Sequence, residues 1–592
     1  MFFKKIDEYI EKSDTFSAIA VLFVALGWIG VILALTGVFY NWLVYLAAIL
    51  IFAAIILVSF RTIYKIKIAK STQWIMIIIL VAVLIFSYYS SPTVFSGRDQ
   101  GTLSNSAIQL MQNHNLYFSS PAVGEFFSIY GPGKALNFPG YYYTQSGELV
   151  SQFPPGYISW LAIYYTIFGL TGFVIANGVT FFFFLMSFYF LGKKYLKNSS
   201  ALALIILVIT SFIFSWFFKF TLSENLALML VWLGIYQFVI FLENKRSFYL
   251  HVSLLTFGLL LFSRIEAVLF LAILFLIIYL KQRDNPLEFI GKTGKILTAG
   301  ILAVYVFSIL KYSEFYLVLL KNVQKFFTGL GNSNLNNSDS LGLLGETAYV
   351  FKIFIIYSLI SEIVVGIVAI LYFFKKKRYK WLIPFFIVAP TFLYIFDPNI
   401  SNDHPWMLRR FLFSVVPTCF LYTVMIVEKY FIRKYLFKVI IILFILNNLI
   451  IFFIFIGFTP HKNLLGQLKN ISQNFRPSDL VLVDQKVTGD GWSMMTGPLS
   501  SLYDIQAVYF INPADLKKID KSKFSKIYFI IPDDNLDFYA KSGILERLKL
   551  IKNYRIENQL LGWEQDNTVW YKIDLPPKQK LAVSGGIYLL NE

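Results

Sequence analysis

The sequence predicts a polytopic α-helical membrane protein with a small C-terminal α/β domain. Of its 592 residues, 57% are hydrophobic and only 15% are charged, whereas soluble proteins keep roughly a quarter of their residues charged. Long apolar runs recur from Ser17 to Gly457, and hydropathy falls from Thr459 onward. We therefore expect a transmembrane domain at 1–459 and a soluble domain at 460–592.

The apolar runs predict about thirteen transmembrane helices. A helix needs roughly 20 apolar residues to cross a bilayer, so the shorter runs are expected to be tilted, extended or partly re-entrant. The predicted spans are 17–39, 41–60, 73–90, 172–191, 200–219, 224–242, 248–262, 267–281, 296–311, 346–373, 381–396, 411–428 and 438–459. The residues before them indicate an amphipathic segment on the cytoplasmic surface and not a cleavable signal.

Basic residues predict the orientation. Short loops rich in Lys and Arg alternate with loops that have few of them. In the long segment 91–155 the only Lys or Arg residues are Arg98 and Lys134. The positive-inside rule then makes this a multi-pass cell-membrane protein with a cytoplasmic N-terminus and an extracytoplasmic C-terminal domain. The net charge of +18 thus reflects topology, and nucleic acid is not an expected partner. The single cysteine, Cys419, excludes an internal disulfide.

The first large outward loop, 91–155, is expected to contain interfacial helices. Five residues share one helical face, which predicts a helix lying on the membrane: Leu103, Ala107, Leu110, Met111 and His114. A second interfacial helix is expected at 157–168, where Pro154 and Pro155 fix an extended approach to Tyr157.

The soluble domain is expected to hold a partly parallel sheet. Apolar runs predict strands at 480–484, 507–511, 526–531 and 569–573, with a helical stretch at 538–550. The domain has no GxGxxG or phosphate-loop motif, so no catalytic role is assigned to it.

Asp99 is the strongest candidate for chemistry. It follows the third predicted span, between Gly97 and Gly101, which allow a sharp turn of the backbone. A carboxylate at the outer mouth of a helical bundle can act as a general base on an acceptor hydroxyl or amine. It can also help to hold a divalent metal cation. The alternative is a solvated loop acid that pairs with Arg98.

Two further acids, Glu224 and Glu266, lie at the predicted outer ends of spans. Ionisable groups so close to the apolar slab are costly and usually face a cavity or each other. The alternative is an interfacial helix cap, with Ser223 or Ser263 supplying the capping hydroxyl.

Arg409 and Arg410 are basic residues on the outer side, against the general charge pattern. Adjacent guanidiniums suit a phosphate, because each planar fork binds two oxygens, and Arg264 could join them. The alternative is snorkelling toward lipid headgroups, with Trp406 as an interfacial anchor.

His404, beside Asp403, is a weak metal-ligand signal, and a structural role is the favoured interpretation.

The ordered set of segments SGRDQGTLSNSAIQL, FPPGYISWLAIYYTIFGLTG, TLSENLAL, SRIEAVLF and HPWMLRRFLFSVVP resembles the integral-membrane glycosyltransferases of the C-type (GT-C) fold. The branch it resembles contains protein O-mannosyltransferases and the lipid A aminoarabinose transferase. The resemblance spans about residues 73–428. It implies inverting transfer from a polyprenyl-phosphate-linked sugar donor, such as dolichyl or undecaprenyl phosphate, to a protein, lipid or glycan acceptor.

The resemblance also implies roles for Asp99 and for the outward basic residues, whereas the other site residues are expected from their own positions in the sequence. Asp99 is expected to be the catalytic base, with Glu224 and Glu266 as further catalytic candidates. Substrate binding is expected from Arg98, Tyr157, Arg264, His404, Arg409 and Arg410. Use of a divalent metal, with Asp99 as a ligand, is left open.

Three departures bear on the sugar and the acceptor more than on the reaction class. Two spans precede the one that leads into the acidic loop, the proline motif FPPG lacks a preceding histidine, and RDQ replaces a tandem acidic pair. The main alternative function is a transporter or flippase, which would place charges or helix breaks at the membrane midplane of repeated halves. A non-catalytic scaffold or receptor is a second alternative.

Overall fold

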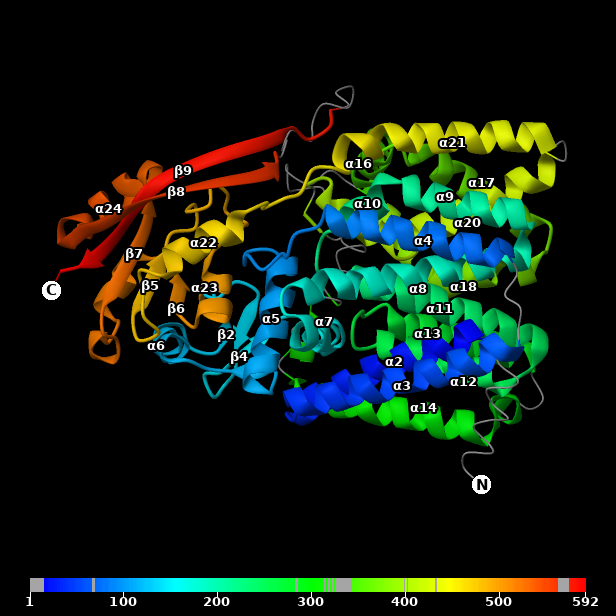
Figure 1. The fold of residues 1–592 in the computed structure, drawn as a ribbon, viewed down its shortest axis with the longest axis horizontal. Coiled ribbons are helices and arrows are strands. Elements are labelled where there is room, and N and C mark those ends of the chain that lie inside the picture. The colour runs from blue at the N-terminus through cyan, green and yellow to red at the C-terminus, as the bar shows by residue number, and fades with distance from the viewer. Residues whose placement is uncertain are drawn as a thin grey trace.

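The computed structural model describes residues 15–65, 70–282, 286–313, 315–317, 320–321, 324, 343–398, 400–401, 403–431, 434–562 and 574–591. The ribbon has two parts: a bundle of roughly aligned helices, and a mixed helix-and-strand unit packed against one end of it (Figure 1). Helix α5 lies at the boundary between them. The predicted N-terminal amphipathic segment lies outside the described residues.

Long apolar runs form the bundle. Its helices are α2 (Thr15–Thr36), α3 (Asn41–Lys65), α4 (Lys70–Tyr88), α7 (Pro155–Phe168), α8 (Thr171–Tyr195), α9 (Asn198–Thr210), α10 (Phe212–Phe217), α11 (Ser223–Asn244), α12 (Ser247–Leu260), α13 (Ala267–Lys281), α14 (Pro286–Lys311), α16 (Leu343–Ile356), α17 (Ile360–Lys375), α18 (Ile383–Val388), α19 (Arg409–Leu412), α20 (Val415–Tyr430) and α21 (Lys434–Phe455). Short 3₁₀ turns flank α18 and precede α19: η1 (Tyr379–Leu382), η2 (Ala389–Ile395) and η3 (Trp406–Leu408).

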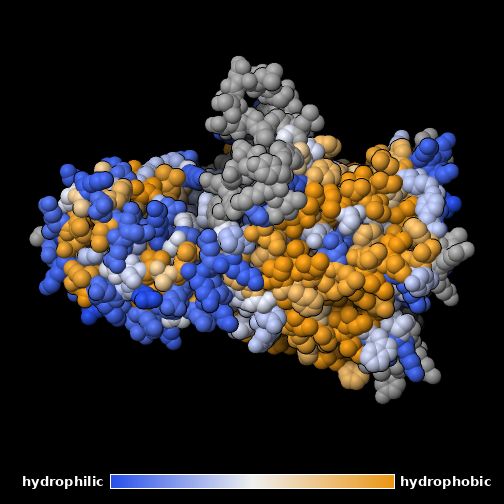
Figure 2. Space-filling model, turned by 90° about the horizontal axis from the view of Figure 1, so that it is seen from above, coloured by the Kyte–Doolittle hydropathy of each residue, from blue (hydrophilic) through white to orange (hydrophobic). Residues whose placement is uncertain are grey.

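The bundle has the surface of a membrane protein. Within the described ranges, seven helices are long and apolar enough to cross a bilayer, or eight if the bent pair Trp406–Leu412 and Val415–Tyr430 counts as one span. Apolar side chains such as Trp42, Phe52 and Phe453 are more than 60% exposed on the outer helices. Figure 2 shows this apolar surface over the bundle and a hydrophilic surface over the other part. The chain is therefore a multi-pass membrane protein.

Several predicted spans are broken in the structure: 200–219 forms α9 and α10, 381–396 forms η1, α18 and η2, and 411–428 begins in α19 and continues in α20. The run 346–373 is divided into α16 and α17, because Ser358 adopts a left-handed conformation with φ of +57°. A left-handed residue cannot continue a right-handed helix.

The outward loop folds as a small unit of its own. It contains α5 (Asp99–Asn113), α6 (Pro121–Tyr130) and a four-stranded antiparallel sheet in the order β1 (Tyr117–Phe118), β4 (Leu149–Ser151), β3 (Tyr141–Tyr143) and β2 (Gly133–Lys134). The expectation that the first of these helices, α5, lies on the membrane is wrong. Its apolar face packs on α7, and its polar residues, Ser104 and Asn105 among them, are buried too. The C-terminal unit covers the side that was expected to meet water.

Residues after 460 form a five-stranded mixed sheet. The strand order is β6 (Gln506–Tyr509), β5 (Leu480–Val483), β7 (Ile527–Pro532), β9 (Lys578–Leu590) and β8 (Leu548–Leu561). Strand β5 pairs in parallel with β6 and β7, whereas β9 runs antiparallel to β7 and β8. Four of the helical segments beside it are α22 (Leu464–Ser472), α23 (Thr496–Tyr503), η4 (Pro513–Lys517) and η5 (Lys521–Lys523).

Two predicted elements lie in the last part of this unit. The helical stretch expected at 538–550 is too long: α24 (Leu536–Lys541) ends early, and η6 (Asp533–Asn535) and η7 (Leu545–Arg547) flank it before β8 begins at Leu548. Pairing with β9 takes the end of that stretch into the sheet, since Leu548 lies opposite Leu590. The strand expected at 569–573 lies outside the described residues.

Polar contacts join the outward loop to the C-terminal unit. Ser96 and Met494 exchange two backbone hydrogen bonds of 2.8 and 2.9 Å, and the Ser96 hydroxyl lies 2.9 Å from that of Thr496. The Gln112 amide donates to the Ser501 carbonyl oxygen at 2.9 Å. The C-terminal unit thereby holds both the segment that leads into α5 and the last turn of α5.

Gly101, in the first turn of α5, is fixed by close backbone approach. A Cβ at this position would lie 1.6 Å from the Phe95 carbonyl oxygen. Backbone cannot yield to such a contact as a flexible side chain could. The loop at 95–98 therefore folds back tightly over the start of α5.

We predict that Gly101→Ala destabilises the protein by at least about 2 kcal/mol, because the added methyl group overpacks this site. Gly124→Ala, in α6, is the control, since nothing lies within 4 Å of an added Cβ there. Thermal unfolding in detergent should show a lower melting temperature for Gly101→Ala alone. Equal shifts for the two variants would contradict the close approach.

Candidate functional site

The start of α5, the helix at the boundary between the two parts of the structure (Figure 1), lines a cavity of about 300 Å³. Its walls come from segments far apart in the sequence: the start of α5, the strand β3, the approach to α7, the first turn of α11, the turn before α13, and α19. Six charged side chains line it: Asp99, Glu224, Arg264, Glu266, Arg409 and Arg410.

Asp99 is placed by the turn that begins α5. Arg98, the residue before the helix, is extended, and Gly97 has a φ of +105°, a conformation that favours glycine. A Cβ on Gly97 would lie 2.9 Å from the Trp492 carbonyl oxygen, so the C-terminal unit also fixes this turn. Both glycines predicted to shape the loop around Asp99 thus have a structural reason.

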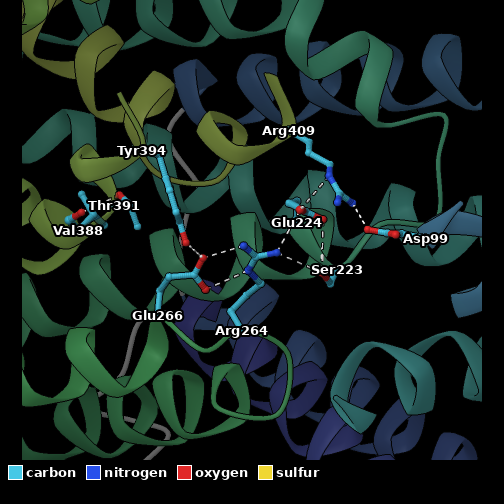
Figure 3. Close-up of polar contacts among 9 residues, drawn as sticks. All are labelled: Asp99, Ser223, Glu224, Arg264, Glu266, Val388, Thr391, Tyr394 and Arg409. Atoms are coloured by element: carbon cyan, nitrogen blue, oxygen red, sulfur yellow. Dashed lines mark hydrogen bonds and ion pairs between the residues drawn. The ribbon is translucent and has the colours of Figure 1, made fainter. Parts of the chain in front are cut away.

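The charged side chains form an alternating network (Figure 3). Arg409 forms an ion pair with Asp99 and lies 3.9 Å from Glu224. Arg264 lies between the two glutamates: it donates to Glu224 at 3.0 Å, and to both carboxylate oxygens of Glu266 at 2.7 and 3.2 Å. The Tyr394 hydroxyl donates to Glu266 at 2.5 Å.

Burial makes this pairing necessary. The side chains of Glu224, Arg264, Glu266 and Arg409 are all less than 10% exposed, whereas Asp99 is 24% exposed. A buried charge without a partner is strongly destabilising. The three acids are balanced formally by Arg264 and Arg409 of the network together with Arg410, which also lines the cavity, and Asp99 forms the accessible end of the network.

The pKa of Glu266 shows the effect of this pairing. Burial alone would raise the pKa of its carboxyl, but the attraction of Arg264 and the hydrogen bonds from Arg264 and Tyr394 outweigh burial and lower that pKa to about 2. Glu266 therefore stays ionised at neutral pH and holds Arg264 in place.

These contacts exclude several alternatives. Asp99 pairs with Arg409 and not with Arg98, which binds Asp403 at 2.8 Å. Neither α11 nor α13 has a side-chain cap, so Ser223 and Ser263 are not capping residues. Both glutamates face the cavity instead.

Arg409 does not snorkel toward lipid headgroups. Its guanidinium lies inside the network and 4.5 Å from the centre of the Trp406 ring. Arg98 lies 4.8 Å from the same ring. Trp406 therefore contacts two guanidiniums.

Three predicted binding residues lie away from this cavity. Arg98 and His404 line a smaller cavity of about 90 Å³ on the side of the C-terminal unit, where the His404 ring meets the Tyr357 hydroxyl at 3.0 Å. Tyr157 is fully buried in the bundle and donates to Asn177 at 2.7 Å. Its helix turns this side chain inward, so it holds α7 against α8.

Tyr394 was not predicted as a site residue, and Ser263 was considered only as a helix cap. Tyr394 lies in a 3₁₀ turn within a run that was assigned to a span, and aromatic residues are too common in this chain to signal a site. Ser263 lines the cavity, and its buried hydroxyl has no hydrogen-bond partner within the described residues. Its position directly before Arg264 was the available signal.

The residues present do not fit a metal ion. Arginines occupy the carboxylates of Asp99, Glu224 and Glu266, and no group of three or more His, Cys, Asp or Glu side chains in the described ranges could hold one. No metal-dependent step is therefore derived for Asp99.

One edge of the cavity is apolar and exposed. Ile265 lines the cavity and is 41% exposed, and on the adjoining turn of α13 Val268 and Leu269 are 47% and 48% exposed. Exposed apolar side chains at this density on a bundle helix suit contact with lipid. The charged cavity thus borders a lipid-facing surface.

Comparisons with known proteins identify the fold. No protein-family model and no curated protein sequence matches the chain. The structure resembles ArnT from Cupriavidus metallidurans in the apo state, with a TM-score of 0.51 and 10% identity, over 87% of this chain and 98% of that one. It also resembles the archaeal oligosaccharyltransferase AglB from Archaeoglobus fulgidus in complex with an inhibitory peptide and a dolichol-phosphate. There the TM-score is 0.50 and the identity 11%, over 80% of this chain and 71% of that one.

Both neighbours are GT-C glycosyltransferases. The fold expected from the ordered motifs is therefore confirmed: this chain has the fold of the C-type integral-membrane glycosyltransferases.

Proposed function

We propose that the chain is a glycosyltransferase that moves a sugar from a polyprenyl-phosphate-linked donor to an acceptor on the extracytoplasmic side of the membrane. Asp99 is the general base, and the transfer inverts the anomeric centre. The observation that carries this proposal is the cavity in which an accessible aspartate and an arginine cluster meet beside exposed apolar residues.

The donor's chemistry matches the two sides of the cavity. Arg409 and Arg410 supply positive charge for the lipid phosphate, and the Arg409 Nε is buried without a hydrogen-bond partner among the described residues. Phosphate oxygens satisfy guanidinium N–H groups well. The prenyl chain leaves the cavity past Ile265 and along the exposed apolar face of α13, so it stays in contact with lipid.

Donor binding also explains how a paired aspartate becomes a base. In the free protein Arg409 is engaged with Asp99. A phosphate at Arg409 competes for the same guanidinium and releases the carboxylate toward the acceptor. The base is thus freed when the donor is in place.

The transfer is a single displacement. Asp99 takes the proton of the acceptor hydroxyl or amine, and the acceptor atom forms its bond to the anomeric carbon. The bond from that carbon to the phosphate oxygen breaks, and the polyprenyl phosphate leaves with the electron pair. Arg409 and Arg410 stabilise the charge that develops on it. One displacement inverts the configuration.

The direction of the helices supports the proposal that the cavity lies on the extracytoplasmic side of the membrane. Helices α11, α13 and α20 each run from the cavity end of the bundle to a basic end, at Lys245, Lys281 and Lys429 respectively. By the positive-inside rule the basic ends are cytoplasmic. The cavity and the C-terminal unit then lie on the outer face.

The fold neighbours add support for the donor class. AglB was seen with a dolichol-phosphate, and the present fold offers cationic and lipid-facing walls in one cavity. A flippase with this fold would move the lipid-linked sugar and leave it attached to its lipid. Chemical transfer is therefore the property to test.

We predict that Asp99→Asn lowers transfer by at least about 100-fold, since it removes the base and keeps the size of the side chain. In the assay, radiolabelled polyprenyl-phosphate sugars are added to membranes that contain the overproduced protein. The label that is released from the lipid is then measured. The exposed Asp537→Asn is the matched control. Unchanged transfer by Asp99→Asn, or label that crosses the bilayer on its lipid, would refute the proposal.

A second prediction concerns the phosphate. Arg409→Lys keeps the charge and loses the planar fork, so kcat/KM for the lipid donor should fall about 10- to 100-fold, the value of one or two charge-assisted hydrogen bonds. The exposed Arg555→Lys is the control. Kinetics that do not change in Arg409→Lys and Arg409→Gln would show that the phosphate binds elsewhere.

A further inference from the structure

A third cavity lies apart from the charged site. It has a volume of about 410 Å³ and opens between the outward loop and the C-terminal unit. This volume falls within the range of about 300–1,000 Å³ typical of small-molecule sites. Its walls are α5, the segments at 118–123 and 138–141, and α23 with the turn that follows it.

One wall separates this polar cavity from the charged cavity. Gln109 and Gln112 of α5 line the polar cavity, whereas Asp99 and Leu103 line the charged one, so the two cavities use different faces of the helix. Strand β3 divides its side chains in the same way: Tyr141 faces the polar cavity and Tyr142 the charged one.

The wall is closed where α5 meets the loop before β3. A Cβ on Gly140 would lie 2.1 Å from the Thr102 hydroxyl, so the two segments touch there. The Thr102 hydroxyl also donates to the Pro139 carbonyl oxygen at 3.4 Å. The polar cavity is therefore a second site and not an extension of the first.

The chemistry of its lining is uncharged and polar. Asp504 is the only charged side chain among the described residues that line the cavity. Amides and hydroxyls dominate, and these groups donate and accept hydrogen bonds. They include those of Gln109, Gln112, Asn113, Ser119, Ser120 and Ser500.

Aromatic rings complete the lining. Phe118, Phe138 and Tyr141 all face the cavity, and Phe138 is only half-buried. An aromatic face carries negative partial charge and attracts polarised C–H groups. A ligand for this cavity should therefore have many hydroxyls, no net charge, and an apolar C–H face.

We propose that this cavity binds a neutral saccharide. A pyranose ring presents hydroxyls at its edge for the amides and serines, and a C–H face for Phe118 or Phe138. Phosphorylated and carboxylated ligands are disfavoured, since no cation lines the cavity within the described residues and Asp504 repels anions. The site does not depend on the transfer reaction, because it lies behind the wall formed by α5.

The test is saccharide binding by the full chain, measured by saturation-transfer NMR and calorimetry. The protein must be kept in a detergent without a sugar headgroup, because a maltoside would compete. The probes are cellobiose, maltose and mannobiose, with galacturonic acid as the charged comparison. At least one neutral disaccharide should bind at millimolar concentration or below, and galacturonic acid should not.

Two variants locate the binding. Gln109→Leu removes an amide and Phe138→Ala removes a ring, and each should weaken the binding about five- to tenfold, as expected for one lost contact. Asn470→Leu, exposed on α22, is the matched control. Thermal unfolding checks that each variant is folded.

The outcomes separate this site from the transfer reaction. Asp99→Asn should bind the same saccharide with unchanged affinity, whether or not transfer is observed. The inference is overturned if no neutral saccharide binds, if galacturonic acid binds equally well, or if both cavity variants bind like the parent protein.

Discussion

The burial of an alternating chain of acids and guanidiniums at the end of an apolar bundle constrains the rest of the structure. Arg264 must lie between Glu224 and Glu266, and Arg409 between Glu224 and Asp99. Each of these charges would be costly beside lipid without its partners. Four helix ends and the start of the outward loop must therefore meet at one place, which fixes how the bundle closes on that side.

That constraint also gives the site its chemistry. The network holds its arginines rigidly, while its most exposed member is the aspartate at the cavity mouth. A preorganised cation beside an accessible carboxylate suits a displacement in which one group receives a proton and another stabilises a leaving phosphate. The neighbouring apolar surface of α13 makes the same cavity suitable for a lipid-linked donor.

The outward loop and the C-terminal unit act as one support for Asp99. The bridge between Ser96 and Met494 and the close approach of Gly97 to Trp492 hold the turn before α5. This support also encloses the polar cavity behind α5. Helix α5 is therefore buried on both faces. Its sequence has apolar residues on one face only, which is why it was predicted to lie on the membrane surface.

Much of this protein could be predicted from its sequence, because its main signals are local. Apolar runs of membrane-spanning length reveal a multi-pass bundle, and the order of motifs from SGRDQG to HPWMLRR indicates the C-type fold at an identity to its neighbours of only 10 to 11%. Asp99, Glu224, Arg264 and Arg409 stood out as charges at the edges of apolar runs.

Only the tertiary structure decided which of these charges meet. It paired Asp99 with Arg409 across 310 positions of sequence, sent Arg98 to Asp403, turned Tyr157 into the bundle and brought Tyr394 to Glu266. Helix packing sets these distances, and a charge in one segment carries no local record of the partner that folding will bring to it.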